Sequence, residues 1–74
     1  MFNGLEKLGW VFREYYKNER VITYSFYNKN MEEEIEVIVY RDSHDIDFIF
    51  DNRMYVRLEV MKALVDIDWK GVEF

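Results

Sequence analysis

Apolar residues recur at every second position through the middle of this 74-residue chain. The alternation covers residues 20–28 and 32–41 and resumes at residue 45 after a short polar turn. Because successive side chains of a strand point to opposite faces of a sheet, the pattern predicts three half-buried strands. Their inner positions carry the apolar set Ile22, Tyr24, Phe26, Ile35, Val37, Val39, Ile46, Phe48 and Phe50.

Two turns set the pairing that we expect between these strands. Across a turn at residues 29–30, the expected pairs are Phe26 with Glu33, Tyr24 with Ile35 and Ile22 with Val37. Across a turn at residues 41–44, they are Val39 with Ile46, Val37 with Phe48 and Ile35 with Phe50. Both registers place the inner set on one face of an antiparallel meander, whereas a slip of one residue would turn that set outward.

The start of the chain has a helical pattern over residues 2–8. The apolar residues that share one face of this helix are Phe2, Leu5 and Leu8. Gly9 stands where a C-terminal cap would end the helix, and Asn3 and Glu6 have capping-box spacing, which would start it slightly later. Residues 10–17 suit either a continuation of the helix through Gly9 or a strand. The cost of an interior glycine and the abundance of strand formers favour the strand.

A second helix is expected from about Leu58 to Trp69. Its predicted apolar stripe is Leu58, Met61, Leu64 and Val65, with Val60 and Ile67 at the edges. Gly71 is the expected terminator. Residues 52–57 could extend the sheet or connect it to this helix.

These elements predict a single small α+β domain over residues 1–74. It has a short N-terminal helix, an antiparallel β-meander of three or four strands, and a C-terminal helix packed on one face. The chain has no cysteine, so a dense core must replace the disulfides that stabilise many small domains. Trp10 and Trp69 are expected in that core or at its rim.

Negative charge is concentrated in residues 31–51. This segment holds eight acidic residues and a single arginine, Arg41, in a chain whose formal net charge is −5. An acidic chain is a poor ligand for nucleic acid or anionic membranes, because both are bound through lysine and arginine. The charge therefore favours a partner protein with a basic surface and predicts no direct binding of nucleic acid or membrane.

The face of the meander opposite the inner set is the candidate partner-binding surface. Acidic and large apolar residues interleave on it: Glu34, Glu36, Ile38, Tyr40, Asp45, Asp47, Ile49 and Asp51. Mixed patches of this kind commonly mark interaction sites. A second copy of the chain could also cover this face, so a homodimer is the alternative.

We expect no catalytic, metal or cofactor site. Ser43, His44 and Asp45 are residue types of a hydrolase triad, but adjacent side chains cannot converge on one substrate. The acidic hairpin lacks the glycine-containing loop that usually gathers calcium ligands. With no signal peptide and no long apolar run, a cytoplasmic location is expected.

Two short motifs carry a family resemblance. One is the opening Leu-Glu-Lys-Leu-Gly-Trp at residues 5–10, and the other consists of Met61, Lys62, Ala63, Leu64 and Trp69. The chain resembles a loose group of small uncharacterised proteins from phages and prophages of Gram-positive bacteria. That resemblance implies an αββββα order and a phage context, with no agreed activity. The chain departs from the group in the C-terminal helix, where residues 65–68 replace a more polar stretch.

Overall fold

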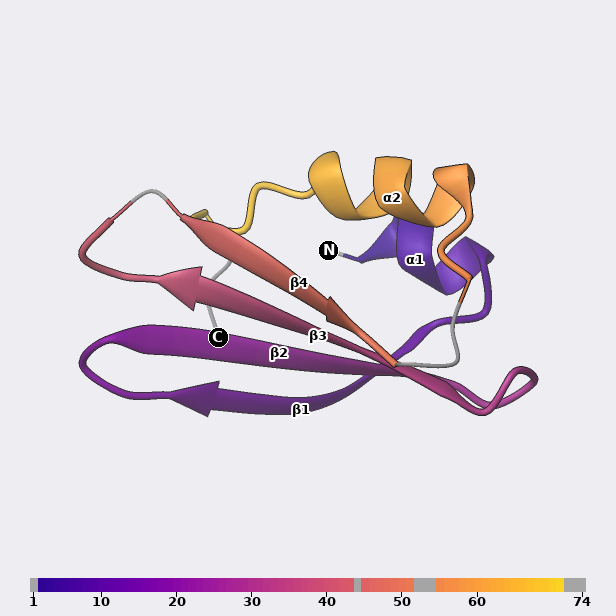
Figure 1. Cartoon of the computed structure of the whole chain (residues 1–74), viewed down its shortest axis with the longest axis horizontal. Helices are drawn as coiled ribbons and strands as arrows, with labels where there is room; N and C mark the ends of the chain where they lie inside the picture. The colour runs from indigo at the N-terminus through magenta and orange to yellow at the C-terminus, as the bar shows by residue number, and fades with distance from the viewer. Residues whose placement is uncertain (1, 44, 52–54, 72–74) are drawn as a thin grey trace.

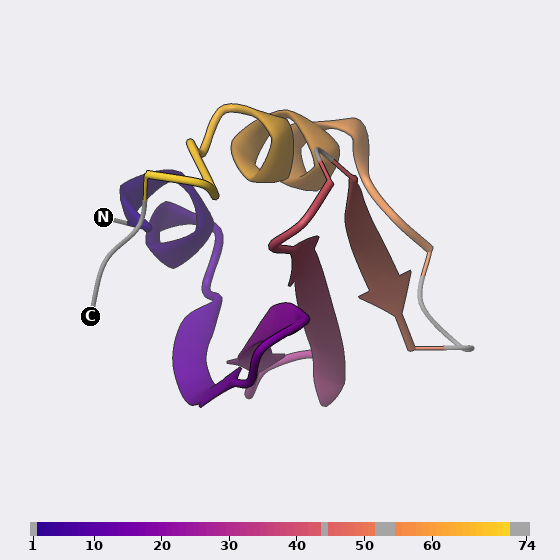
Figure 2. The same ribbon diagram turned by 90° about the vertical axis from the view of Figure 1, so that its left-hand side faces the viewer.

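The computed structural model describes residues 2–43, 45–51 and 55–71. Its elements, in chain order, are α1 (Asn3–Lys7), β1 (Val11–Lys17), β2 (Val21–Asn28), β3 (Glu33–Tyr40), β4 (Ile46–Phe50) and α2 (Leu58–Val65) (Figure 1). The strands form one antiparallel sheet in the order β1-β2-β3-β4. Both helices lie over the same face of this sheet (Figure 2). The expected α+β arrangement is confirmed, and residues 10–17 contribute a strand.

Gly9 ends α1 and directs the chain into the sheet. Its φ of 91° lies in the left-handed region that favours glycine. The amides of Gly9 and Trp10 donate to the carbonyls of Glu6 and Leu5, each at 3.0 Å. The expected capping box is wrong, because Phe2 is the N-cap residue and no side chain caps the helix.

A β-bulge in β1 explains why residues 10–17 had an ambiguous pattern. The register with β2 shifts between Phe12 and Glu14, so Phe12 lies opposite Phe26 and Tyr15 lies opposite Tyr24. The extra residue, Arg13, brings Phe12 and Tyr15 to the same face although they are three residues apart. A spacing of three between apolar residues is also what a helix produces.

The predicted register between β2 and β3 is wrong by two residues. The structure pairs Phe26 with Ile35, Tyr24 with Val37 and Ile22 with Val39. The turn is longer than expected, because Asn28 pairs with Glu33 and Glu32 takes a left-handed conformation with φ 52°. A shift of two residues leaves every side chain on its expected face, so the inner and outer sets survive the error.

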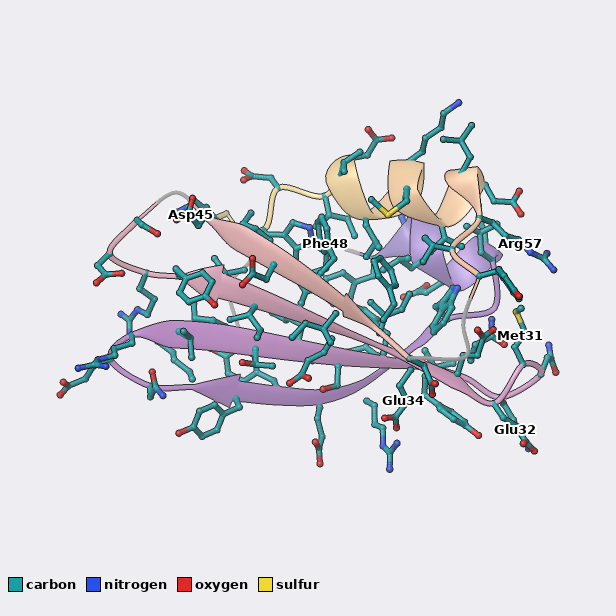
Figure 3. All side chains as sticks on the ribbon, in the orientation of Figure 1. Met31, Glu32, Glu34, Asp45, Phe48 and Arg57 are labelled. Carbon is teal, nitrogen blue, oxygen red and sulfur yellow. The ribbon has the colours of Figure 1, made fainter. Side chains whose placement is uncertain are left out.

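The predicted register between β3 and β4 is confirmed at all three pairs. Five of the nine inner residues are buried, namely Tyr24, Phe26, Ile35, Val37 and Val39. The other four, Ile22, Ile46, Phe48 and Phe50, are half-buried and pack against that core. Phe48, for example, lies between the sheet and the helices (Figure 3).

The predicted buried stripe of α2 is wrong in part. Leu64 is fully buried, but Leu58 and Val65 are 70% and 60% exposed, and Val60 takes a core position instead. The two helices approach closely at Gly4 and Ala63, where a Cβ at Gly4 would lie 3.3 Å from the Ala63 Cβ. This contact accompanies a helix orientation that points Val60 and Leu64 towards the core.

The second helix also ends earlier than expected, at Val65. Trp69 lies beyond it, and its indole N–H donates to the Leu64 carbonyl at 2.8 Å. Gly71 is therefore not the helix terminator; its amide donates to Asp68 in a later turn. Residues 55–57 lie outside any strand, and residues 52–54, which could have extended the sheet, lie outside the described residues.

Aromatic rings from both ends of the chain meet in the core. Phe2 lies 5.0 Å from Phe26 and 5.8 Å from Trp69, measured between ring centroids. Trp69 lies 5.3 Å from Tyr24. Trp10 and Trp69 are each 2% exposed, as expected for core residues. The residues next to each helix are thus joined to the sheet by aromatic contacts, and aromatic side chains bury large areas.

Candidate interaction face

The eight candidate partner-binding residues all come from β3, β4 and the positions next to β4. Glu36 pairs with Ile49 and Ile38 pairs with Asp47. Beyond the strand ends, the Tyr40 amide donates to the Asp45 carbonyl at 3.1 Å and the Asp51 amide donates to the Glu34 carbonyl at 3.3 Å. By this register the eight residues follow one side of the hairpin. Figure 3 shows Glu34 on the side of the sheet away from both helices.

We call this side of the four-stranded sheet the outer face. Its five acidic residues on β3, on β4 and directly next to β4 are all exposed: Glu34, Glu36, Asp45, Asp47 and Asp51. Ile49 is 46% exposed between them, whereas Ile38 and Tyr40 are half-buried. Neither helix covers this face (Figure 2). The structure therefore brings the predicted residues together, and their role in binding stays a prediction.

The outer face extends onto β1, which sequence reasoning left open. Val11 and Tyr16, 61% and 59% exposed, pair with Tyr27 and Thr23 of β2, and Glu14 pairs with Ser25. These residues widen the mixed acidic and apolar surface by a further strand. Alternation along β1 would have assigned these residues to the outer face, but the bulge interrupts that alternation.

Arg13 forms an ion pair with Glu34 across the outer face. Its guanidinium also lies 5.7 Å from the centre of the Tyr27 ring. Cation–π contacts of this kind add a modest attraction at exposed sites. Both side chains of the ion pair are 57% exposed, so water screens the pair. The bulge places this arginine over β2, and nothing in the local sequence pattern predicted it.

Tyr40 and Asp47 form a second internal contact on this face. The Tyr40 hydroxyl donates to the Asp47 Oδ2 at 2.8 Å. This hydrogen bond raises the pKa of Tyr40, and the negative charge of Asp47, partial burial and the charge of Asp45 act in the same direction. The bond orients an aromatic ring and a carboxylate together at one end of the outer face.

Two shallow hollows flank Glu36 near the middle of the outer face. One, of ≈ 220 Å³, lies towards β4 and includes Ile49 and Asp51 in its lining. The other, of ≈ 160 Å³, lies towards β1 and includes Glu14 and Tyr16. Glu36 lines both hollows. Each could receive a side chain of a partner beside a carboxylate.

The outer face is strongly acidic as a whole. Among the residues that the structure describes, the register and contacts assign it six carboxylates and one basic side chain, Arg13. Adjacent exposed carboxylates repel one another and attract basic groups. Chemically, this arrangement suits the docking of cationic side chains.

Ser43 and Asp45 lie in the connection between β3 and β4. The Asp45 amide donates to the Ser43 Oγ at 3.2 Å, a local contact typical of turns. His44 lies outside the described residues. Within residues 2–43, 45–51 and 55–71, no group of three or more histidine, cysteine, aspartate or glutamate side chains could hold a metal ion.

The comparisons with known proteins give no relative for this chain. No protein-family model matches it, and no curated protein or solved structure matches it significantly. Neither helix in the described part of the chain is long and apolar enough to cross a membrane.

Proposed function

We propose that this chain is a non-enzymatic binding protein that docks its acidic outer face on a basic surface of a partner protein. The observation that supports the proposal most directly is the placement of charge. Six carboxylates and exposed apolar side chains share the one sheet face that no helix covers. Folding gains nothing from gathering like charges in this way, whereas a basic partner would relieve their repulsion.

The expected energetics divide between the charges and the apolar residues. The carboxylates speed association and select basic partners, because charge complementarity acts mainly on encounter and specificity. Ile49, Val11 and Tyr16 are exposed enough to be covered by a partner and supply apolar contact. The hollows beside Glu36 would receive lysine or arginine side chains.

The proposed setting is the cytoplasm of a bacterial host, with the chain encoded by a phage or prophage. This setting comes from the sequence resemblance, and the partner would be a host protein. A basic surface that normally binds nucleic acid would suit the outer face, since a row of carboxylates can imitate a phosphate backbone. Competition between this protein and DNA for the captured partner would test that mimicry.

The test removes charge from the outer face without changing its shape. The quadruple variant E34Q/E36Q/D45N/D47N would be compared with wild type in capture from a host lysate at low and high salt. The captured partner would then be measured by binding kinetics. We expect association at low salt to slow about tenfold and its salt dependence to flatten.

A matched control removes four exposed acids from other parts of the structure. The variant E6Q/E19Q/E59Q/D66N changes the net charge equally but leaves the outer face intact. It should associate at nearly the wild-type rate. Unchanged binding of the outer-face variant would refute the proposal, and equal losses in both variants would reduce it to non-specific charge attraction.

A homodimer is the second candidate, because the sheet has an accessible edge. β1 is an edge strand that carries exposed Val11 and Tyr16, and such edges can pair with another chain. Its bulge opposes that pairing by twisting the edge. Sedimentation at micromolar concentration separates the candidates: a monomer removes the homodimer.

A further inference from the structure

Glu33 is an acidic residue that lies on the inner side of the sheet, opposite the outer face. It begins β3 and shares the inner alternation with Ile35, Val37 and Val39. It pairs with Asn28, which is 2% exposed. Glu33 itself is only 9% exposed, and its Oε1 atom is buried without a hydrogen-bond partner among the residues that the structure describes. A carboxylate therefore lies in the inner row of β3, next to the buried polar residue Asn28.

Glu33 lines a pocket at the end of the sheet, which we call the Glu33 pocket. Its volume is ≈ 630 Å³, and its described lining residues are Met31, Glu32, Glu33, Asp51, Tyr55 and Arg57. The β2–β3 turn supplies one wall and the segment before α2 supplies another (Figure 3). The pocket is open to solvent and large enough for an amino-acid side chain.

The chemistry of the pocket selects a positively charged ligand. Glu33 lines the pocket with a largely buried carboxyl group, and burying a carboxylate away from water costs free energy that a cation placed beside it would offset. Glu32 and Asp51 add negative charge to the same lining. Met31, 42% exposed, and Tyr55, 91% exposed, offer apolar contact for an alkyl chain. The ring of Tyr55 could also attract the cation.

An organic cation fits this site better than a metal ion. No group of three or more metal-ligating side chains converges within the described residues. Divalent metals need several converging oxygen ligands, whereas an ammonium or guanidinium group needs only one carboxylate and some apolar contact for its stem.

We propose that the Glu33 pocket binds the ammonium or guanidinium group of a lysine or arginine side chain from a partner protein. Arg57 lies in the same lining and opposes the incoming cation by repulsion. Glu33 faces the helix-covered side of the sheet, so this site is distinct from the outer face. Asp51 lines both the pocket and one outer-face hollow. A partner that reaches round this end of the sheet could occupy both sites.

The test uses three small probes and the intact protein. N-acetyl-lysine methylamide and N-acetyl-arginine methylamide carry the cationic groups, and N-acetyl-norleucine methylamide has the same lysine stem without the charge. Backbone amide signals would be followed by NMR during titration. We expect a cationic probe to shift the signals of Glu33 and Tyr55 saturably, and the norleucine probe to leave them unchanged.

Two substitutions separate the carboxylate from general surface charge. E33Q keeps the shape of the side chain and should weaken binding of the cationic probe about tenfold. E36Q removes one charge from the outer face and should leave this binding unchanged. R57Q removes the competing cation and should strengthen binding severalfold, which provides a readout even if E33Q folds poorly.

Several results would overturn the proposal. They are equal shifts with the norleucine probe, full binding by E33Q, and weaker binding by R57Q. Shifts confined to Glu36 and Ile49 would place the cation on the outer face, which refutes the Glu33 pocket and leaves the proposed function standing. Saturable binding of Ca²⁺ that displaces the lysine probe would assign the pocket to a metal ion instead.

Discussion

The carboxylates of the outer face differ in the contacts that they already make within the protein. Glu34 is paired with Arg13, and Asp47 accepts a hydrogen bond from Tyr40. The Glu36 side chain has no hydrogen bond or ion pair to any residue that the structure describes, and hollows lie on both sides of it. A partner that binds at Glu34 or Asp47 must share or break an existing contact. Glu36 is the carboxylate best placed to gain a new one.

Replacing Asp47 by Asn should lower the pKa of Tyr40. The hydrogen bond to Asp47 is the largest cause of the raised pKa, and the charge of Asp47 is the next. NMR titration of the Tyr40 ring would measure the change. D51N, which removes a charge from the same face at a distance from Tyr40, should leave this pKa in place. An unchanged pKa in D47N would contradict the assigned hydrogen bond.

The hydrogen bond between Tyr40 and Asp47 also predicts that stability decreases at alkaline pH. A tyrosine whose pKa is higher in the folded state stabilises that state in its protonated form. The contribution is complete below the ordinary tyrosine value of about 10 and is lost as the pH rises above it. D47N should therefore lose less stability than wild type over this alkaline range, as measured by denaturant unfolding.

At the scale of elements, the orientation of α2 determines which of its leucines stabilise the fold. Leu64 is fully buried, whereas Leu58 on the same helix is 70% exposed. The hydrophobic stripe alone placed both residues in the core. The observed helix, which contacts α1 at Gly4 and Ala63, has a different orientation from the predicted one. The two leucines thus provide matched positions for measuring burial.

Leu64→Ala should destabilise the fold by about 2–5 kcal/mol, since it removes buried methyl groups and leaves a cavity. Leu58→Ala makes the same chemical change at an exposed site and should alter stability by only about 0.5 kcal/mol. Chemical denaturation of both variants would measure the difference. Equal losses would mean that the predicted stripe was correct and the observed orientation of α2 is wrong.

At the scale of the whole molecule, the fold has one covered and one uncovered sheet face. Segments near both ends of the chain meet on the covered face, because Phe2 and Trp69 stack on each other and both contact Phe26 of β2. The uncovered face carries the acidic residues. Because the two faces are separate, substitutions in the core should change stability, whereas substitutions on the outer face should leave the fold intact.

Val37→Asp should unfold the protein. Val37 is fully buried in β3, between β2 and β4, and an unpaired charge there should cost about 4 kcal/mol or more. A domain of this size has only a few kcal/mol of net stability. Circular dichroism would detect the loss of structure. Ile49→Asp, on the outer face, should remain folded, and a folded V37D would refute the assignment of faces.

The sequence by itself determined which side chains of β2, β3 and β4 face inward. Alternation has a period of two, so it fixes faces without fixing the partner of each residue. The inner and outer sets therefore survived a wrong register between β2 and β3. Local chemistry also located the end of α1 at Gly9, where a left-handed conformation favours glycine.

Only the tertiary structure decided the features that depend on distant contacts. The bulge at Arg13 gives β1 a spacing compatible with a helix, and pairing with β2 makes it a strand. Packing against α1 accompanies the orientation of α2. The Arg13–Glu34 ion pair and the Glu33 pocket each join residues far apart in the chain. Local periodicity carries no information on such contacts, because they arise only when separate elements pack together.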